Sequence, residues 1–371
     1  MLRFLFTLRQ WKGATRALAA LVTLLLLLAA RAPGSTRATL RDPAQDARYA
    51  AALSRAPPAA AGAYTPSHLE TQWATHAREW AGELCARIAA ERPTWQRWFD
   101  AGAGGGAGDA GEWSTLTVPG LGAAPAVVRL EPLAGFLRDP RPSCPGLGLT
   151  PVLTRDTEDA KAHLFLDPAF YALLAASLRA TPASSVAPPR ALLFDIGSTR
   201  WEPVLNSETG FGGARWFVDA YAKLDIEFDS VFAWEARPVS AREYFGSMPL
   251  ALAGKWHFYN FPVMGPRHVG GGALPGPEDP LELLRAVARP GDFVVFKIDI
   301  DTEALEESIV AQLLLDEGLG ALVDDLYFEH HVRNEVMDPR GWGGGQVRDV
   351  QDSIEFFQAL RRHGIRAHSW P

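Results

Sequence analysis

One short stretch, Asp292–Glu303, constrains the fold most strongly, because it joins a buried strand to three acids. It reads D-F-V-V-F-K-I-D-I-D-T-E, and a Pro-Gly pair precedes it. The run Phe293–Ile298 is short and almost wholly apolar, which predicts a strand buried on both faces of a parallel sheet. Ligands of open α/β sheets bind at the carboxyl ends of the strands. Asp299, Asp301 and Glu303 are therefore candidates for holding a cofactor, a metal or a substrate, or for capping the following helix.

From Ala191 onward, strand-like runs alternate with helical patterns. This alternation predicts parallel β-α units and an α/β domain with a doubly wound sheet. The first two units, which begin at Leu192 and Ser230, have the form of a nucleotide-binding half. The expected strands are Leu192–Ile196, Ser230–Trp234, Trp256–Val263, Phe293–Ile298, Leu326–Phe328 and Ile365–Trp370.

Composition limits the function classes. The 371 residues suffice for a full hydrophobic core, and a net charge of −7 gives no sign of a nucleic-acid-binding surface. Cys85 and Cys144 are the two cysteines. They could pair in an oxidising compartment or remain buried thiols, and their spacing does not suit zinc.

Residues 1–32 have the pattern of a signal anchor or a signal peptide. Met1–Arg16 contains four basic residues and no acid, and the uncharged run Ala17–Ala30 follows. A basic cytosolic end followed by a short span predicts a single-pass type II protein of the Golgi or endoplasmic reticulum, with its catalytic domain in the lumen. The alternatives are a cleaved signal peptide on a secreted protein and an organellar transit peptide.

The remaining segments divide by composition. Residues 33–66 are rich in Ala, Pro, Arg and Ser and are expected to form a stalk or linker. Residues 67–185 are predicted to form an N-terminal region with helices and short strands. The Pro/Ser-rich segment Thr181–Pro189 marks the boundary to the α/β domain at residues 191–371.

The first motif of that domain is Leu192–Trp201, L-L-F-D-I-G-S-T-R-W. A strand runs through Asp195 into a turn at Gly197, where a missing side chain lets the backbone approach a ligand. The motif resembles D-x-G-x-x-x-G of class I S-adenosylmethionine-dependent methyltransferases, and in particular F-D-I-G-A-N-x-G of the FkbM-type branch. Trp201 stands where the last glycine belongs, and glycines reappear in Thr209–Gly213. The alternative is an ordinary strand and turn.

Two further motifs support the same resemblance. Val231–Pro238 places Glu235 at the end of the second strand, where nucleotide-binding folds use an acid to bind ribose hydroxyls. A surface glutamate at a strand end is the simpler alternative. Lys297-Ile298-Asp299 matches the start of the FkbM-type K-I-D-x-E-G-x-E, although Asp301 and Thr302 replace its Glu and Gly.

A fourth motif, Leu326–Val332, reads L-Y-F-E-H-H-V and resembles the strand-terminal E-x-H of that family. His330 is the candidate base or metal ligand here. The alternative is a histidine with a structural role only.

The resemblance, which covers about the last half of the chain, implies S-adenosylmethionine as cofactor and a hydroxyl of a glycan or small hydroxylated metabolite as acceptor. It implies no metal. The expected cofactor-binding residues are Asp195, Gly197, Ser198 and Glu235, and the expected catalytic residues are Asp299 and His330.

Two other functions remain open at this stage. Asp299-Ile300-Asp301 is also a D-x-D pattern, which in a lumenal type II glycosyltransferase would bind the divalent metal of a nucleotide sugar. Trp201 and the altered Asp301-Thr302 would equally suit a non-catalytic, methyltransferase-like binding module. Metal dependence separates glycosyl transfer from methyl transfer. Binding of S-adenosylmethionine separates the methyltransferase from the non-catalytic module.

Overall fold

The computed structural model describes residues 43–58, 62–87, 89–91, 93, 113–118, 125–134, 165–180, 187–201, 214–265, 276–333 and 346–370. The expected anchor at 1–32 and the glycine run Thr209–Gly213 lie outside these ranges. Among the described residues, no helix has the length and apolar character needed to cross a membrane.

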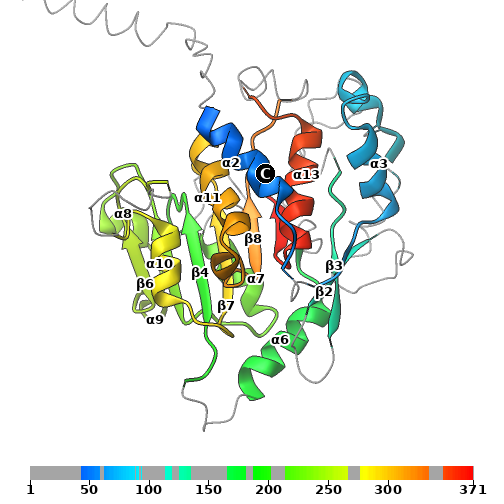
Figure 1. Ribbon diagram of the computed structural model, residues 1–371. Coiled ribbons are helices and arrows are strands. Elements are labelled where there is room, and N and C mark those ends of the chain that lie inside the picture. Colours follow the sequence, from blue (N-terminus) through cyan, green and yellow to red (C-terminus); the bar gives the residue numbers. More distant parts are fainter. Residues whose placement is uncertain are drawn as a thin grey trace, which may run out of the picture. The chain divides into compact units, whose positions relative to one another are not determined.

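A six-stranded parallel sheet forms the centre of the protein, as the alternating pattern predicts (Figure 1). Every neighbouring pair of its strands is parallel. Because the order reverses direction after β4, the chain winds first one way and then the other from the middle of the sheet. The order is β6 (Trp256–Tyr259), β5 (Ser230–Trp234), β4 (Ala191–Ile196), β7 (Phe293–Ile298), β8 (Asp325–Phe328) and β9 (Arg366–Ser369).

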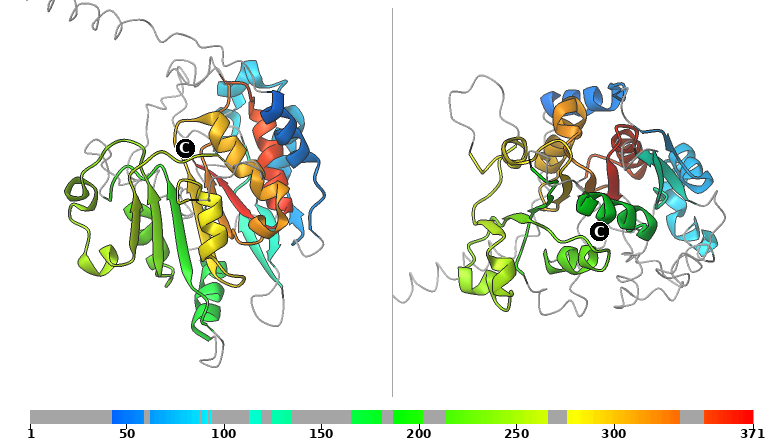
Figure 2. Two further views of the ribbon diagram at one scale, coloured as in Figure 1. Left: turned by 60° about the vertical axis from the view of Figure 1, so that its left-hand side comes forward. Right: turned by 90° about the horizontal axis from the view of Figure 1, so that it is seen from below.

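Helices cover both faces of this sheet. Figure 2 shows α10 (Pro280–Val287), α11 (Glu303–Leu315) and α13 (Val350–Arg362) on one face, and α6 (Pro168–Ala180) with α7 (Ala214–Ala222) on the other. Since both faces are covered, all residues of β4, β7, β8 and β9 are buried. The shorter helices are α8 (Ala241–Phe245), α9 (Leu250–Ala253) and α12 (Glu317–Gly320).

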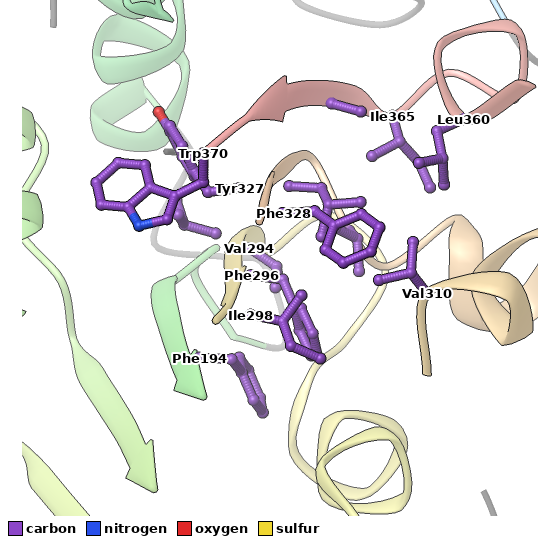
Figure 3. Close-up of a cluster of buried hydrophobic side chains, with 14 of the residues drawn as sticks. Phe194, Val294, Phe296, Ile298, Val310, Tyr327, Phe328, Leu360, Ile365 and Trp370 are labelled. Carbon is purple, nitrogen blue, oxygen red and sulfur yellow. The ribbon is translucent and has the colours of Figure 1, made fainter. Parts of the chain in front are cut away.

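Side chains of β8 alternate between the two faces, as a strand requires. Figure 3 shows Tyr327 near Trp370 and Phe328 toward Leu360. The ring of Trp370 stacks on Phe217 of α7 with centroids 5.1 Å apart, whereas Phe328 contacts Phe357 of α13 at 5.8 Å. The same alternation, continued past β8, places His330 and His331 on different faces.

The N-terminal region packs on the same core instead of forming a separate unit. Residues Arg41–Pro371 make one compact body. It contains a three-stranded antiparallel sheet and further helices on the chain before the parallel sheet. These elements are α2 (Pro43–Ser54), β1 (Tyr64–Thr65), α3 (His68–His76), a 3₁₀ turn at Ala81–Glu83, β2 (Ser114–Val118) and β3 (Ala126–Leu130).

Helix α2 lies within the segment that composition suggests is a linker. Tyr49 anchors it: the Arg348 guanidinium lies 3.7 Å from the Tyr49 ring centroid, and the Tyr49 hydroxyl donates a 2.9 Å hydrogen bond to the Asp352 carbonyl oxygen. Ala52 is fully buried beside it. The buried residues of α2 are Tyr49 and Ala52, about one helical turn apart, so the mostly polar and small composition of the segment obscures the helix.

A buried ion network joins the N-terminal region to α13. Arg361 is fully buried and donates hydrogen bonds to a carboxylate oxygen of Glu131 at 2.7 Å and to its carbonyl oxygen at 2.8 Å. The same guanidinium lies 3.4 Å from the buried carboxylate of Glu70. Glu131 also contacts His368 of β9 at 3.0 Å. Elsewhere in this region Cys85 is disulfide-bonded, and its expected partner, Cys144, lies outside the described residues.

Candidate cofactor and catalytic site

Four neighbouring strands end at one level of the sheet. Ile196 of β4 pairs with Trp234 of β5 and with Ile298 of β7, and Ile298 pairs with Phe328 of β8. The next residue of each strand therefore lies at the same edge, centred on the β4–β7 boundary where the winding reverses. Ligands of open α/β sheets bind at this point. The residues at this level are Glu235, Gly197, Asp299 and Glu329.

Gly197 forms the turn that leaves β4. Its φ of +89° lies in the left-handed region, and a Cβ atom there would fall 1.7 Å from the carbonyl oxygen of Asp299. Its N–H donates a 3.1 Å hydrogen bond to the Trp234 carbonyl oxygen. Only glycine meets both the conformational and the steric demand, so the sequence motif at this position has a physical cause.

Lys297 of β7 contacts the ends of both β4 and β7. The side chain is fully buried, and its Nζ lies 3.4 Å from Asp195 Oδ1, 3.3 Å from Asp299 Oδ2 and 3.0 Å from the Gly197 carbonyl oxygen. Burial alone lowers the pKa of Lys297, but the carboxylates of Asp299 and Asp195 outweigh it and raise that pKa. Burial likewise raises the pKa of Asp299, but the Lys297 ammonium outweighs it and keeps that pKa below its usual value.

The four predicted cofactor-binding residues do not lie at equal depth. Asp195 is fully buried beneath the edge against Lys297. Ser198 is also fully buried, and its hydroxyl forms a 2.7 Å hydrogen bond with the Tyr244 hydroxyl. Gly197 and Glu235 lie at the edge itself, where Glu235 accepts a 2.6 Å hydrogen bond from the Arg237 N–H. Gly197 is half-buried and Glu235 is 5 % exposed, so these two residues are slightly more accessible than Asp195 and Ser198.

Trp201, which replaces the last glycine of the motif, packs away from this edge. It is buried, its N–H donates a 3.1 Å hydrogen bond to the Tyr244 carbonyl oxygen, and its ring meets Trp256 edge to face. The large side chain thus belongs to the core between α8 and β6.

The two histidines after β8 point in opposite directions. His330 continues the face of Phe328, against which it stacks, and its ring nitrogens contact Ser353 Oγ at 2.5 Å and Glu307 Oε1 at 3.2 Å. His331 follows the other face and contacts Glu329 Oε2 at 3.1 Å. The structure therefore places His330 in a buried network with α11 and α13, and places His331 beside Asp299 and Glu329. Strand alternation from Tyr327 is the signal that separates the two histidines.

Glu329, His331 and Glu306 form a buried group of titratable side chains beside Asp299. Burial raises the pKa of Glu329 to about 8; His331 opposes this shift and Asp299 adds to it. Burial lowers the pKa of His331, but its contact with Glu329 outweighs this and raises that pKa to about 9. Burial also raises the pKa of Glu306 to about 7, against the hydrogen bond from Ile300 N–H. Three side chains with raised pKa values therefore lie close together on the β8 side of the edge.

Comparisons with protein-family models, with curated proteins and with solved structures give no significant match. The class that the structure establishes is an α/β protein with a six-stranded parallel sheet and a polar edge at its point of reversal. The FkbM-type resemblance rests on the motifs alone.

Proposed function

We propose that the α/β domain is an S-adenosylmethionine-dependent methyltransferase that methylates a hydroxyl of a glycan or small hydroxylated metabolite. The observation that carries the proposal is the placement of Gly197 and Glu235 at one level on adjacent strands. In nucleotide-binding sheets a glycine turn after the first strand and an acid after the second receive the cofactor and its ribose. The strand order, read as 3-2-1-4-5-6 from β4, is also the order of such sheets.

The residues then divide between two sides of the edge. Gly197 and Glu235 would receive the cofactor on the β4–β5 side, and Asp299, which contacts Lys297, would lie at the boundary with the acceptor. The methyl group of a sulfonium is already electrophilic, so the protein needs chiefly to align it with the acceptor oxygen. A hydroxyl acceptor must also lose a proton. Glu329 and His331 lie beside Asp299 on the β8 side of the edge.

Substitution of Glu235 by alanine is the first test. We expect isothermal titration calorimetry to show that the full chain binds S-adenosylmethionine and that Glu235→Ala lowers the affinity at least about tenfold. This change corresponds to the loss of one charge-assisted hydrogen bond, worth about 1.5–3 kcal/mol. Glu227→Ala is the matched control, since Glu227 is exposed and precedes the other end of β5. Equal affinities of the two variants would show that Glu235 does not bind the ribose.

The same instrument addresses the two other functions. A nucleotide sugar with Mn²⁺ that binds in place of S-adenosylmethionine would favour glycosyl transfer. The contact between Asp299 and the Lys297 ammonium argues against that function, because it neutralises the first acid of the D-x-D pattern. Binding of S-adenosylmethionine without methylation of any hydroxylated acceptor would favour a non-catalytic module.

We also propose that residues 1–32 anchor the chain as a type II protein of the Golgi or endoplasmic reticulum, with the α/β domain in the lumen. Four basic residues before an uncharged run support the proposal. Fractionation of cells that express a C-terminally tagged chain is expected to recover it with membranes. Full-length protein found only in the cytosol would contradict the anchor.

A further inference from the structure

A set of metal-ligand atoms converges on the β8 side of the candidate site. Asp301, Glu329 and His331 each offer one ligand atom, and these atoms all lie within 4.8 Å of one another. Ligands bound to one tetrahedral cation at about 2.0–2.2 Å lie about 3.3–3.6 Å apart. Side-chain adjustments of up to about 1 Å would therefore bring the three atoms into one coordination sphere. Glu329 and His331 follow β8, and Asp301 lies in the turn between β7 and α11, so all three lie at the same edge of the sheet.

A second, independent observation concerns Glu306, in the first turn of α11. The side chain is fully buried, and its Oε1 accepts a 2.7 Å hydrogen bond from Ile300 N–H. Among the described residues, Oε2 has no hydrogen-bond partner. The charges of His331, Asp299 and Asp301 act on the pKa of Glu306, so this carboxylate lies near the cluster. A buried oxygen without a partner is destabilising, and an ion or its bound water satisfies such an oxygen.

Neighbouring charges decide where a cation would sit. Lys297 lies 3.3 Å from Asp299, and its ammonium repels a second cation at that carboxylate. Asp301, two residues on, is exposed and lies with Glu329 and His331. A cation therefore fits between Asp301 and the end of β8, and not between Asp299 and Asp301 as the D-x-D pattern would suggest.

We propose that Asp301, Glu329 and His331 bind one divalent transition-metal cation, with Glu306 accepting hydrogen bonds from water bound to it. One imidazole nitrogen and two carboxylate oxygens form the mixed N,O ligand set that suits Zn²⁺, Mn²⁺ and Fe²⁺. Three protein ligands leave positions open for water or an oxygen ligand of a substrate. The inference follows from the ligand geometry and does not rest on methyl transfer.

Metal titration of the full chain tests the site without any other substrate. After treatment with EDTA and removal of any affinity tag, one equivalent of Mn²⁺ or Zn²⁺ is expected to bind. Loss of an outer-sphere partner typically weakens metal binding about 10–100-fold, and we expect this decrease in affinity for Glu306→Gln. His331→Ala removes a ligand, so its decrease in affinity should be larger than that of Glu306→Gln. His257 is an exposed histidine of β6, so the control variant His257→Ala should leave the affinity for the metal unchanged. Unchanged affinity in a folded His331→Ala variant would overturn the proposal.

A measurement on the unsubstituted chain covers the case in which the variants fail to fold. Fe²⁺ with ascorbate and peroxide produces hydroxyl radicals at the bound ion, and these radicals oxidise its ligands. Mass spectrometry should find oxidation at His331 and not at His330, and excess Zn²⁺ should suppress it. Oxidation spread equally over both histidines would reject the site. Binding of S-adenosylmethionine is measured separately, so failure of the metal site and failure of the proposed function are distinguishable.

Discussion

Replacement of Arg361 by methionine is expected to lower the free energy of unfolding by about 3–5 kcal/mol. The guanidinium is fully buried, and it donates hydrogen bonds to Glu131 and lies 3.4 Å from Glu70. Methionine would fill much of the volume but leave two carboxylates, both almost wholly buried, without their cation. Native domains have only about 5–15 kcal/mol of stability, so the loss is a large share of the total.

Arg362→Met is the matched control, because Arg362 is the next residue of α13 and is exposed. Thermal or urea unfolding of the two variants should show a large loss for Arg361→Met and a change within about 0.5 kcal/mol for Arg362→Met. Equal unfolding midpoints would mean that Glu70 and Glu131 are satisfied by their other partners, and that Arg361 contributes packing alone.

Substitution of Gly197 by alanine is the second change expected to have a large effect. An alanine with φ near +89° costs about 1–2 kcal/mol in backbone strain, and its Cβ would meet the Asp299 carbonyl oxygen at 1.7 Å. Backbone displacement to relieve such overpacking adds about 1–3 kcal/mol. Since the displacement falls between the ends of β4 and β7, we expect loss of S-adenosylmethionine binding as well as of stability.

Gly291→Ala is the control, because it introduces the same backbone strain without a steric contact of the new Cβ atom. Its φ is +92°, and no atom lies within 4 Å of the position that a Cβ would occupy. Gly291→Ala should therefore show the strain alone, and the difference between the two variants in urea unfolding isolates the contact with Asp299. If both variants lose equal stability and both bind the cofactor normally, β4 and β7 do not depend on close contact at this turn.

The parallel sheet could be predicted from the sequence because most of its strands can be recognised from a few consecutive residues. The central strands are short apolar runs, and the run Phe293–Ile298 coincides with β7 to the residue. The strand expected over Trp256–Val263 ends earlier, at Tyr259. The final strand was expected over Ile365–Trp370 and is observed over Arg366–Ser369, a difference at the ends only. Gly197 could be selected because left-handed backbone and close approach both demand glycine, and that demand is visible in a single residue type.

The rest of the site depends on which way side chains point. A pattern that ends in two histidines does not show which one faces the edge until the alternation of β8 is followed beyond its last hydrogen-bonded residue. His331, Glu329 and Glu306 come together only because β7, β8 and α11 pack side by side. The N-terminal region posed a harder problem, since Glu131 and its partner Arg361 are 230 residues apart. No local pattern encodes such a pair.

That separation also sets an order of events during synthesis of the chain. Glu70 and Glu131 emerge from the ribosome long before Arg361, and at about 5–20 residues per second the wait after Glu131 lasts about 12–46 s. During this interval the N-terminal strands have two acids that belong in the interior and no cation with which to bury them. The described part of the N-terminal region therefore completes this buried network only after the final helix has been made, and it must remain soluble until then.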